Sequence, residues 1–425
     1  MKIRDWDRNL KIRLFGEALM NVTFWMFFPF MAIYFTDVFG KDKAGFLLIF
    51  SQLFSVIASL LGGYCADRFG RKRMMVLSAY GQGLAFFFFA LASSPWFTSP
   101  FVGFLCFTLA GIFGSFYWPA SQAMVADVVP ERDRSSVFAV FYTSINIAVV
   151  IGPMIGGIFY EKHLFELLLA TGFSGVMLAT ILVKMLQETA PVYSIENGSS
   201  MKWYEFLREQ IHSYGVIIRD KTFLLFIVAG ILVGQTFMQL DLLIPVYTKE
   251  VVGKQTLFSL GDYSVVLSGE KAFGLLISEN GLLVALFTVW VTKWMSRYRE
   301  RSVFIGSSVI YGLSIIMFGQ TTNIWGLIGA MALFTFAELM TAGIQQTFIS
   351  KLAPEEMRGQ YFAAASLRWT IGRTIAPLSI TITLWIGYEW TFLILSLLAL
   401  LSAFLYVVMF QRFEQQQAKK TLPQV

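Results

Sequence analysis

A short basic segment lies between two long apolar runs and decides how the chain folds. It reads Gly63-Tyr-Cys-Ala-Asp67-Arg68-Phe-Gly70-Arg71-Lys72-Arg73. The runs on either side, near 44–66 and 74–93, are each long enough to cross a bilayer as a helix, which takes about 20 residues. Gly70 suits a tight turn between antiparallel spans, and Gly63 suits the close approach of two helices. We expect Asp67 to pair with the neighbouring arginines or with a helix N-terminus.

The composition of the whole chain extends this pattern. Of its 425 residues, 56% are hydrophobic and only 14% are charged, whereas soluble domains carry about 25% charged residues. The sequence therefore predicts an all-α polytopic membrane protein with twelve transmembrane helices in two six-helix bundles. We place these spans near residues 12–37, 44–66, 74–93, 100–123, 135–160, 165–187, 222–248, 272–293, 302–319, 324–349, 360–385 and 389–411.

The basic residues predict the orientation. Most of the 33 Lys and Arg residues flank the spans on the side of the N-terminus, so both termini are predicted to be cytoplasmic in a cell-membrane protein. A polar stretch at 191–220 contains an amphipathic run, Trp203 to Ile218, with the spacing of a surface helix. We expect it to link an N-terminal bundle, 1–190, to a C-terminal bundle, 221–425.

The segment at 63–73 resembles the signature cytoplasmic loop of the major facilitator superfamily, G-x-x-x-D-R-x-G-R-K, with every defining position filled. The segment Asp127-x-x-Pro130-x-x-x-Arg134 resembles the partner of that loop. The resemblance implies two bundles that rock around a midplane site, with the loop as a latch of the outward-facing state. The implied latch residues are Gly63, Asp67, Arg68, Gly70, Arg71, Asp127 and Arg134.

A second motif lies in the fifth predicted span. Its residues, Gly152-Pro153-Met-Ile-Gly156-Gly157, are similar to the core of the antiporter motif of drug/proton exchangers. Ala148 stands where the full motif has an upstream glycine. Proline and clustered glycines bend a buried span and permit close packing, here predicted against the eighth span. The motif favours export, and the alternative interpretation is a generic packing kink.

Ionisable side chains inside predicted spans are costly and are therefore functional candidates. Three acids qualify for proton coupling or substrate binding, namely Asp241, Glu338 and Glu17. A carboxylate at that depth can hold a proton or pair with a positively charged substrate. Alternatively, such an acid is neutralised by hydrogen bonds or by pairing with Arg368 or Arg373.

Further residues are candidates for the wall of a cavity. Residues 234, 238, 241 and 245 are predicted to share one helical face. Arg373 either neutralises Glu338, which would favour an anionic or zwitterionic substrate, or extends towards the cytoplasm, which we favour. The cavity candidates are Asn146, Trp118, Gln235, Met238 and Arg373.

The acids and the latch together resemble the LmrP-type multidrug/proton antiporters, although the acid expected early in the fifth span is absent. The resemblance implies a secondary transporter, not an enzyme, that exports hydrophobic, cationic compounds, antibiotics among them, in exchange for protons by alternating access. We expect protons, such substrates and membrane lipids as partners, a functional monomer, and no nucleic acid, metal or cofactor. A lipid or glycolipid flippase and a proton-coupled transporter of a specific metabolite remain as alternatives.

Overall fold

The computed structural model describes residues 3–190, 202–215, 219–260, 263–354 and 357–421. The chain divides into two compact units, which we describe separately. Unit 1 comprises Met1–Arg208 and Phe273–Gly281, and unit 2 comprises Glu209–Ala272 and Leu282–Val425. Parts of the predicted linker, 191–201 and 216–218, lie outside the described residues. The proposed boundaries at 190 and 221 stay a prediction.

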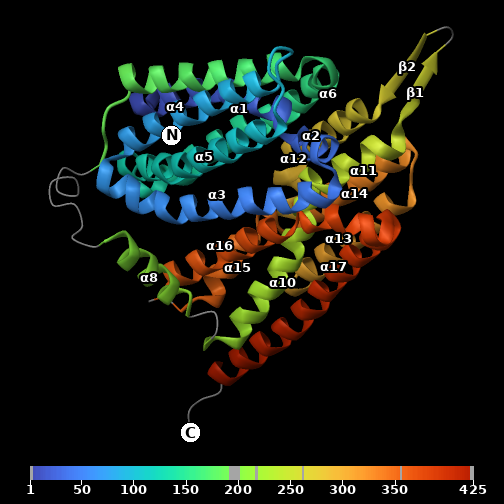
Figure 1. The fold of residues 1–425 in the computed structure, drawn as a ribbon. Coiled ribbons are helices and arrows are strands. Elements are labelled where there is room, and N and C mark those ends of the chain that lie inside the picture. The colour runs from blue at the N-terminus through green and yellow to red at the C-terminus, as the bar shows by residue number, and fades with distance from the viewer. Residues whose placement is uncertain (1–2, 191–201, 216–218, 261–262, 355–356, 422–425) are drawn as a thin grey trace. The chain divides into compact units, whose positions relative to one another are not determined.

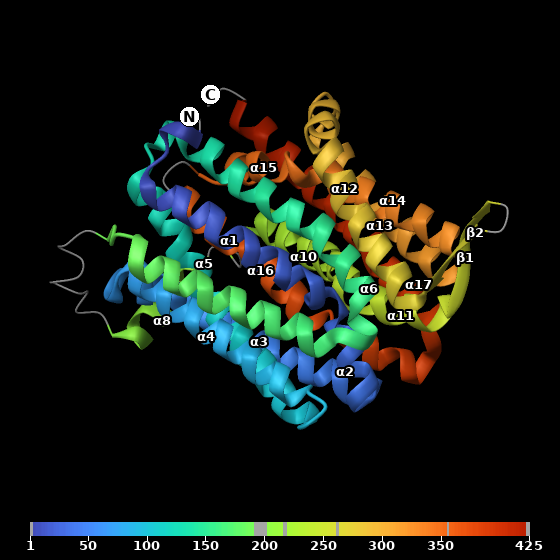
Figure 2. The same ribbon diagram turned by 90° about the horizontal axis from the view of Figure 1, so that it is seen from above.

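Unit 1 is a bundle of long helices (Figures 1 and 2). α1 packs against α6, α3 against α5, and α4 against both α5 and α6. α6 covers two predicted spans, and its backbone leaves helical geometry at His163 (φ −129°, ψ 31°). The elements are η1 (Ile3–Asp5), α1 (Arg8–Phe27), η2 (Phe28–Phe30), α2 (Met31–Phe39), α3 (Lys41–Phe69), α4 (Arg71–Ala92), α5 (Pro100–Val128) and α6 (Glu131–Met185).

Unit 2 is also mainly helical. α10 packs against α16 and α17, and α13 packs against α14 and α17. α17 is interrupted at Gly387, whose φ of 77° favours glycine. α12 contributes Phe273–Gly281 to unit 1. The helices are α10 (Lys221–Phe237), η3 (Met238–Asp241), α11 (Leu243–Val252), α12 (Gly269–Met295), α13 (Glu300–Gln320), α14 (Ile324–Ala342), α15 (Gln345–Leu352), α16 (Arg358–Ile375) and α17 (Leu378–Thr421).

The described residues contain 10 helices that are long and apolar enough to cross a membrane. Two of these are interrupted, α6 at His163 and α17 at Gly387. Dividing them there, and taking α16 with the first part of α17, gives a helical counterpart for each of the twelve predicted spans. The chain is therefore a multi-pass membrane protein, as predicted.

The linker helix and a hairpin complete the fold. α8 (Trp203–Ser213) forms the first part of the predicted amphipathic run, and its Ile211 is 68% exposed. β1 (Lys254–Leu260) and β2 (Tyr263–Ser268) pair antiparallel in unit 2. The all-α prediction missed this hairpin, although its β-branched residues between Gly253 and Gly269 are a strand signal. Gln255 Nε2 donates to the Thr322 carbonyl at 2.6 Å and so attaches the hairpin to the α13–α14 connection.

Candidate functional site

The helix that carries Asp241 is discontinuous. α10 ends at Phe237, the 3-10 helix η3 follows, and α11 begins after Leu242, whose φ of −121° and ψ of −76° are not helical. Pro245 has no N–H, so the Asp241 carbonyl receives no helical hydrogen bond from that position. The prediction that residues 234, 238, 241 and 245 share one face assumed a continuous helix, and the break at Leu242 separates Pro245 from the other three.

A second break lies in the same unit. α16 ends at Ile375 and α17 begins at Leu378, with Pro377 between them. The proline deprives the Arg373 carbonyl of its helical donor, just as Pro245 does for Asp241. Each broken helix thus carries a charged residue four positions before a proline.

Hydrogen bonds hold the two breaks side by side. Ser379 Oγ donates to Gln239 Oε1 at 2.6 Å, and Gln239 Nε2 lies 3.4 Å from the Ala376 carbonyl oxygen that accepts its hydrogen bond. The helices are also in close backbone contact, since a Cβ added to Gly372 would lie 2.8 Å from the Gln235 nitrogen. Gln239 is fully buried. The discontinuities of α10–α11 and α16–α17 therefore form one polar region inside unit 2.

Asp241 is the acid of this region. Its Oδ1 atom is buried and has no hydrogen-bond partner among the described residues. Arg373, on the other broken helix, interacts with it electrostatically. Among the described residues no ion pair joins Arg373 to Asp241, and Arg373 is exposed. Both alternatives for Arg373, neutralisation of Glu338 and extension towards the cytoplasm, stay predictions. Arg368 is buried elsewhere, with its guanidinium 4.3 Å from the centre of the Phe226 ring.

Glu338 has neighbours on α13. It interacts electrostatically with Tyr311, whose ring packs edge-to-face on Phe334 at 5.0 Å between centroids. Ser307 Oγ donates to the Ala337 carbonyl at 2.7 Å and fixes the same helix pair. Glu338 is half-buried and lies at the contact between α13 and α14.

The sequence analysis passed over one acid, Glu279 on α12. Its Oε2 atom is buried and has no hydrogen-bond partner within the described parts of the chain. It belongs to the segment of α12 that is part of unit 1. Its position within an apolar run would have been enough to make Glu279 a candidate membrane acid. Its polar neighbours Ser278 and Asn280 make this part of the run less apolar, which hid the signal.

Glu17 lies in a closed network in unit 1. Arg13 Nε is 2.8 Å from Glu17 Oε1, and the Tyr117 hydroxyl donates to the same oxygen at 2.6 Å. Arg13 is 2% exposed and also donates to the Ser121 carbonyl at 2.7 Å. This arrangement matches the alternative in which a membrane acid is neutralised by hydrogen bonds and an ion pair.

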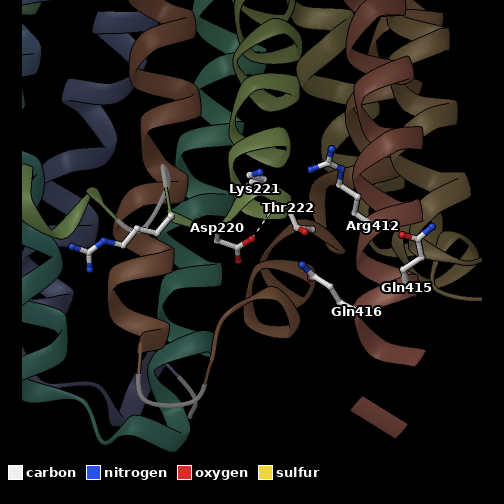
Figure 3. Close-up of a pocket in the computed structure, with 7 residues that line it drawn as sticks. Asp220, Lys221, Thr222, Arg412, Gln415 and Gln416 are labelled. Carbon is white, nitrogen blue, oxygen red and sulfur yellow. Dashed lines mark hydrogen bonds between the residues drawn. The ribbon is translucent and has the colours of Figure 1, made fainter. Parts of the chain in front are cut away.

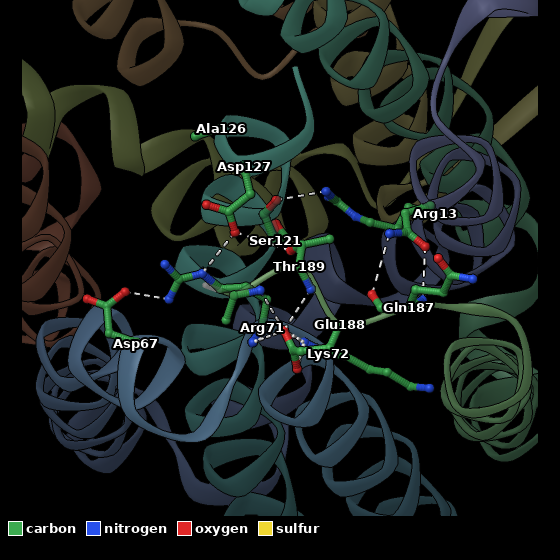
Figure 4. Close-up of polar contacts among 12 residues, drawn as sticks. Arg13, Asp67, Arg71, Lys72, Ser121, Ala126, Asp127, Gln187, Glu188 and Thr189 are labelled. Atoms are coloured by element: carbon green, nitrogen blue, oxygen red, sulfur yellow. Dashed lines mark hydrogen bonds and ion pairs between the residues drawn. The ribbon is translucent and has the colours of Figure 1, made fainter. Parts of the chain in front are cut away.

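Three of the predicted latch residues, Asp67, Arg71 and Asp127, form a polar cluster in unit 1 (Figure 4). Gly70 adopts φ 96°, which confirms the glycine-dependent turn. Arg71 forms an ion pair with Asp67, and its Nε is 3.3 Å from Asp127 Oδ2. Thr189 Oγ1 donates to the same Asp127 oxygen at 3.2 Å. The expectation that Asp67 pairs with a neighbouring arginine is confirmed.

An unpredicted residue, Glu188, completes this cluster. Its carboxylate accepts the backbone N–H groups of Arg71 at 2.8 Å and Lys72 at 3.1 Å, and so caps the N-terminus of α4 (Figure 4). A Cβ on Gly70 would lie 2.5 Å from Glu188 Oε2. The glycine is therefore needed both for its backbone conformation and for space. No local pattern reveals a cap that comes from 116 positions away.

Two further predicted latch residues, Arg68 and Arg134, form hydrogen bonds with residues close to them in the sequence. Arg68 donates to the Tyr64 hydroxyl one turn earlier in α3. Arg134 Nη2 donates to the Ala126 carbonyl at 2.8 Å, and its Nε donates to the Val129 carbonyl at 3.1 Å. Arg134 thus satisfies carbonyl groups at the C-terminus of α5.

The expectation for Gly63 is wrong. A Cβ added there would meet nothing within 4 Å in the part of the chain that the structure describes. The close approach is made by its neighbour Gly62, where an added Cβ would lie 2.8 Å from Pro119 Cγ. One residue along a helix is a rotation of about 100°, so adjacent glycines face different neighbours.

The glycines of the second motif pack α6 against α1. A Cβ on Gly156 would overlap the Met26 carbonyl oxygen, and a Cβ on Gly152 would lie 2.6 Å from the Trp25 Cβ atom. Neither position has room for a side chain. The backbone of α6 therefore approaches the backbone of α1 directly.

The same motif packs against α12. A Cβ on Gly274 would lie 2.6 Å from the Pro153 carbonyl oxygen and 3.1 Å from the Cα atom of Gly157. Gly274 is in the part of α12 that belongs to unit 1. The predicted packing against the eighth span is confirmed.

The predicted cavity residues fall into both units. In unit 2, Gln235 is 4% exposed and bonded to Thr236, and Met238 lies in η3 beside Asp241. In unit 1, Trp118 is 55% exposed. Asn146 donates to the Tyr142 carbonyl of its own helix at 2.9 Å.

Comparison with known proteins places the chain in a family. The family model described as Major Facilitator Superfamily matches residues 14–377 and 263–424. The chain belongs to this superfamily. It is 56% identical over 419 residues to a Na(+), Li(+), K(+)/H(+) antiporter of Planococcus maritimus, covering 98% of this chain and 99% of that protein. It is 23% identical to the multidrug resistance protein MdtH of Photorhabdus laumondii subsp. laumondii, covering 84% and 82%.

Solved structures agree with this assignment at the level of the fold. A POT family transporter in complex with 5-aminolevulinic acid superposes with a TM-score of 0.78 at 16% identity, over 96% of this chain and 97% of that chain. The nucleoside transporter NupG superposes with a TM-score of 0.75 at 14% identity, over 95% of this chain and 100% of that chain. The predicted major facilitator fold is confirmed.

Proposed function

We propose that this protein is a secondary antiporter that exchanges a monovalent cation for protons at Asp241. The observation that supports the proposal most strongly is the buried Oδ1 atom of Asp241, which has no hydrogen-bond partner among the described residues and lies at a helix break. The relative at 56% identity carries the description Na(+), Li(+), K(+)/H(+) antiporter. This proposal replaces hydrophobic compounds with small cations as the first candidate substrates.

The chemistry of the break suits a small cation. Hard cations prefer oxygen ligands, and broken membrane helices provide carbonyl oxygens that no helical N–H occupies. Pro245 and Pro377 create that condition at the carbonyls of Asp241 and Arg373. One carboxylate is neutralised by one proton or by one monovalent cation, so the two compete for the same group.

Arg373 has a part in this exchange. Its electrostatic interaction with Asp241 compensates the charge of the carboxylate after both proton and cation have left. The guanidinium therefore competes with the cation and promotes its release. We propose that exchange proceeds by alternating access, with both termini cytoplasmic and the Asp67–Arg71–Asp127 cluster as the latch.

A second candidate is the export of hydrophobic cations. Phe237 lies one turn before Asp241, and its ring packs edge-to-face on Trp369 at 5.5 Å between centroids. Trp369 is 37% exposed. Aromatic faces beside a carboxylate attract flat organic cations, and relatives such as MdtH are described as multidrug resistance proteins.

Everted membrane vesicles test the first candidate. With a proton gradient reported by acridine orange, we expect NaCl, LiCl or KCl to dissipate the gradient in vesicles with the wild-type protein, and choline chloride to leave it intact. Asp241→Asn should abolish this response. Asp42→Asn, the same change at an exposed acid at the start of α3, is the matched control.

The outcomes separate the two candidates. Absence of a response to all three cations from well-expressed wild type would refute cation/proton exchange. Protonophore-sensitive ethidium efflux in the same cells, lost in Asp241→Asn and in Trp369→Ala, would then support the export of hydrophobic cations.

A further inference from the structure

A cationic cavity lies at the start of α10, away from the breaks. Its volume is about 890 Å³, and all of its lining residues belong to unit 2. They come from residues 219–222, at and just before the start of α10, and from the last turns of α17 (Figure 3). The lining residues are Arg219, Asp220, Lys221, Thr222, Arg412, Gln415 and Gln416.

The single acid of this cavity is already occupied. Asp220 Oδ1 accepts the backbone N–H groups of Thr222 at 2.9 Å and Phe223 at 3.1 Å, and so caps α10. Its Oδ2 accepts the Tyr361 hydroxyl at 2.9 Å. Both oxygens of the Asp220 carboxylate are therefore used in hydrogen bonds within the protein. The cavity keeps an excess of positive charge from its three basic side chains.

Two of these basic side chains, Lys221 and Arg412, differ from others at the same end of the unit. Arg301 is paired with Glu414 at 3.2 Å, and Lys351 is paired with Glu300. In the described parts of the chain, no ion pair joins Lys221 or Arg412 to a carboxylate. Yet Arg412 lies only two residues from Glu414. The described residues therefore do not neutralise the positive charge of Lys221 and Arg412, and this charge is available to bind an anionic ligand.

A buried hydroxyl group points to the same conclusion. Thr222 lines the cavity and is 1% exposed, and its Oγ1 has no hydrogen-bond partner among the described residues. A buried polar atom without a hydrogen-bond partner destabilises a fold. An oxygen of a bound ligand would accept the hydrogen bond of this hydroxyl. The amides of Gln415 and Gln416 offer further donors on α17.

We propose that this cavity binds a phosphate ester, with Lys221, Arg412 and Arg219 as its cations and Thr222 Oγ1 as a donor. Phosphate oxygens require several donors and compensating charge, and both are present here. The cavity lies where α10 and α17 leave their apolar spans, which is the depth of lipid phosphates. Basic pockets on the cytoplasmic side of membrane helices bind anionic headgroups. The bound phosphate joins the start of α10 to the end of α17.

Lipid binding to the purified full-length protein tests this site. Native mass spectrometry from detergent measures retention of phosphatidylglycerol and, for comparison, of phosphatidylcholine. We expect Lys221→Gln/Arg412→Gln to weaken retention of phosphatidylglycerol by about tenfold or more, since each basic residue near a membrane surface contributes about 1 kcal/mol. Arg301→Gln/Lys351→Gln removes the same charge from paired positions and should retain the lipid as the wild type does.

Two further variants guard against a folding artefact. Lys221→Arg/Arg412→Lys should restore binding, because charge and donors return. Thr222→Val should weaken phosphatidylglycerol binding severalfold without lowering the melting temperature of the lipid-free protein, since its Oγ1 has no partner to lose. A lower melting temperature with unchanged lipid binding would assign the hydroxyl to the fold and overturn its role here.

Inorganic phosphate distinguishes the source of the ester. Displacement of phosphatidylglycerol by millimolar phosphate would indicate a soluble phosphate ester as ligand, and resistance to displacement would indicate a lipid headgroup. Equal retention of phosphatidylglycerol by the wild type and Lys221→Gln/Arg412→Gln, with no effect of phosphate on either, would overturn the proposal. None of these measurements depends on transport, so they stand apart from the test at Asp241.

Discussion

Glu17 and Asp241 are both single acids inside apolar helices, yet their surroundings differ. Glu17 lies in the continuous helix α1, and one of its oxygens is held by Arg13 at 2.8 Å and by Tyr117 at 2.6 Å. Asp241 lies at a break, and its Oδ1 has no hydrogen-bond partner among the described residues. The difference teaches that a membrane acid whose carboxylate accepts hydrogen bonds stabilises the fold. An acid with a carboxylate oxygen that has no hydrogen-bond partner can bind a proton or a cation.

The largest expected effect is on exchange. Asp241→Asn should reduce cation-induced dissipation of the proton gradient to the level of vesicles without the protein, because an amide neither releases a proton nor neutralises a cation. Glu17→Gln should keep exchange when it is normalised to folded protein. The comparison breaks if Glu17→Gln abolishes exchange in well-folded protein while Asp241→Asn leaves it unchanged.

The second effect is on thermal stability, and here Glu17→Gln should have a larger effect than Asp241→Asn. Glu17→Gln leaves the Arg13 charge buried without its partner, which should destabilise unit 1 by about 3–5 kcal/mol. Asp241→Asn removes no hydrogen bond of Oδ1 and should therefore lower the melting temperature less than Glu17→Gln does, although Arg373 loses its electrostatic partner. Thermal unfolding in detergent measures both.

A double variant identifies the cause of that loss. Arg13→Met/Glu17→Leu removes both charges together and should recover much of the stability, because well-packed apolar residues replace a buried ion pair at little loss. A double variant less stable than Glu17→Gln would show that the hydrogen bonds to Tyr117 and Ser121, not the buried charge, dominate.

The third effect concerns the break itself. Pro245→Ala returns an N–H donor to the Asp241 carbonyl and so favours continuous helix. We expect the cation concentration for half-maximal response to rise about tenfold, equivalent to about 1.4 kcal/mol, with a similar maximal response. Pro100→Ala, at the first turn of α5 where proline is tolerated, should have no effect. An unchanged half-maximal concentration in Pro245→Ala would separate the break from cation binding.

The smallest effect extends the comparison to an exposed acid. Glu188 has a full set of donors, as Glu17 has, but it lies at the surface. Glu188→Gln should lower the stability of unit 1 by about 1 kcal/mol, because the lost contacts are caps of α4 in a solvated environment. Thermal unfolding measures this loss beside Glu161→Gln, an exposed acid of α6, as control. A loss as large as that of Glu17→Gln would show that burial is not the deciding difference.

Sequence patterns predicted the contacts that depend on local spacing. The ion pair of Asp67 and Arg71 joins residues four apart on one face, and the turn at Gly70 follows from glycine itself. The antiporter motif predicted its packing against α12, because Gly157 leaves room for Gly274. It did not predict that Gly152 and Gly156 pack against α1. Prediction failed for Gly63, because the face that a glycine presents depends on how its helix is rotated.

The sequence by itself determined the spans and the family, since apolar length and the 63–73 segment are properties of the chain alone. Only the tertiary structure decided which acids are satisfied. Glu17 receives its bond from Tyr117, 100 positions away, and the breaks at Asp241 and Arg373 meet through Gln239 and Ser379, 140 positions apart. Helix length depends on neighbouring residues, whereas the partner of a buried charge depends on which distant helices pack beside it.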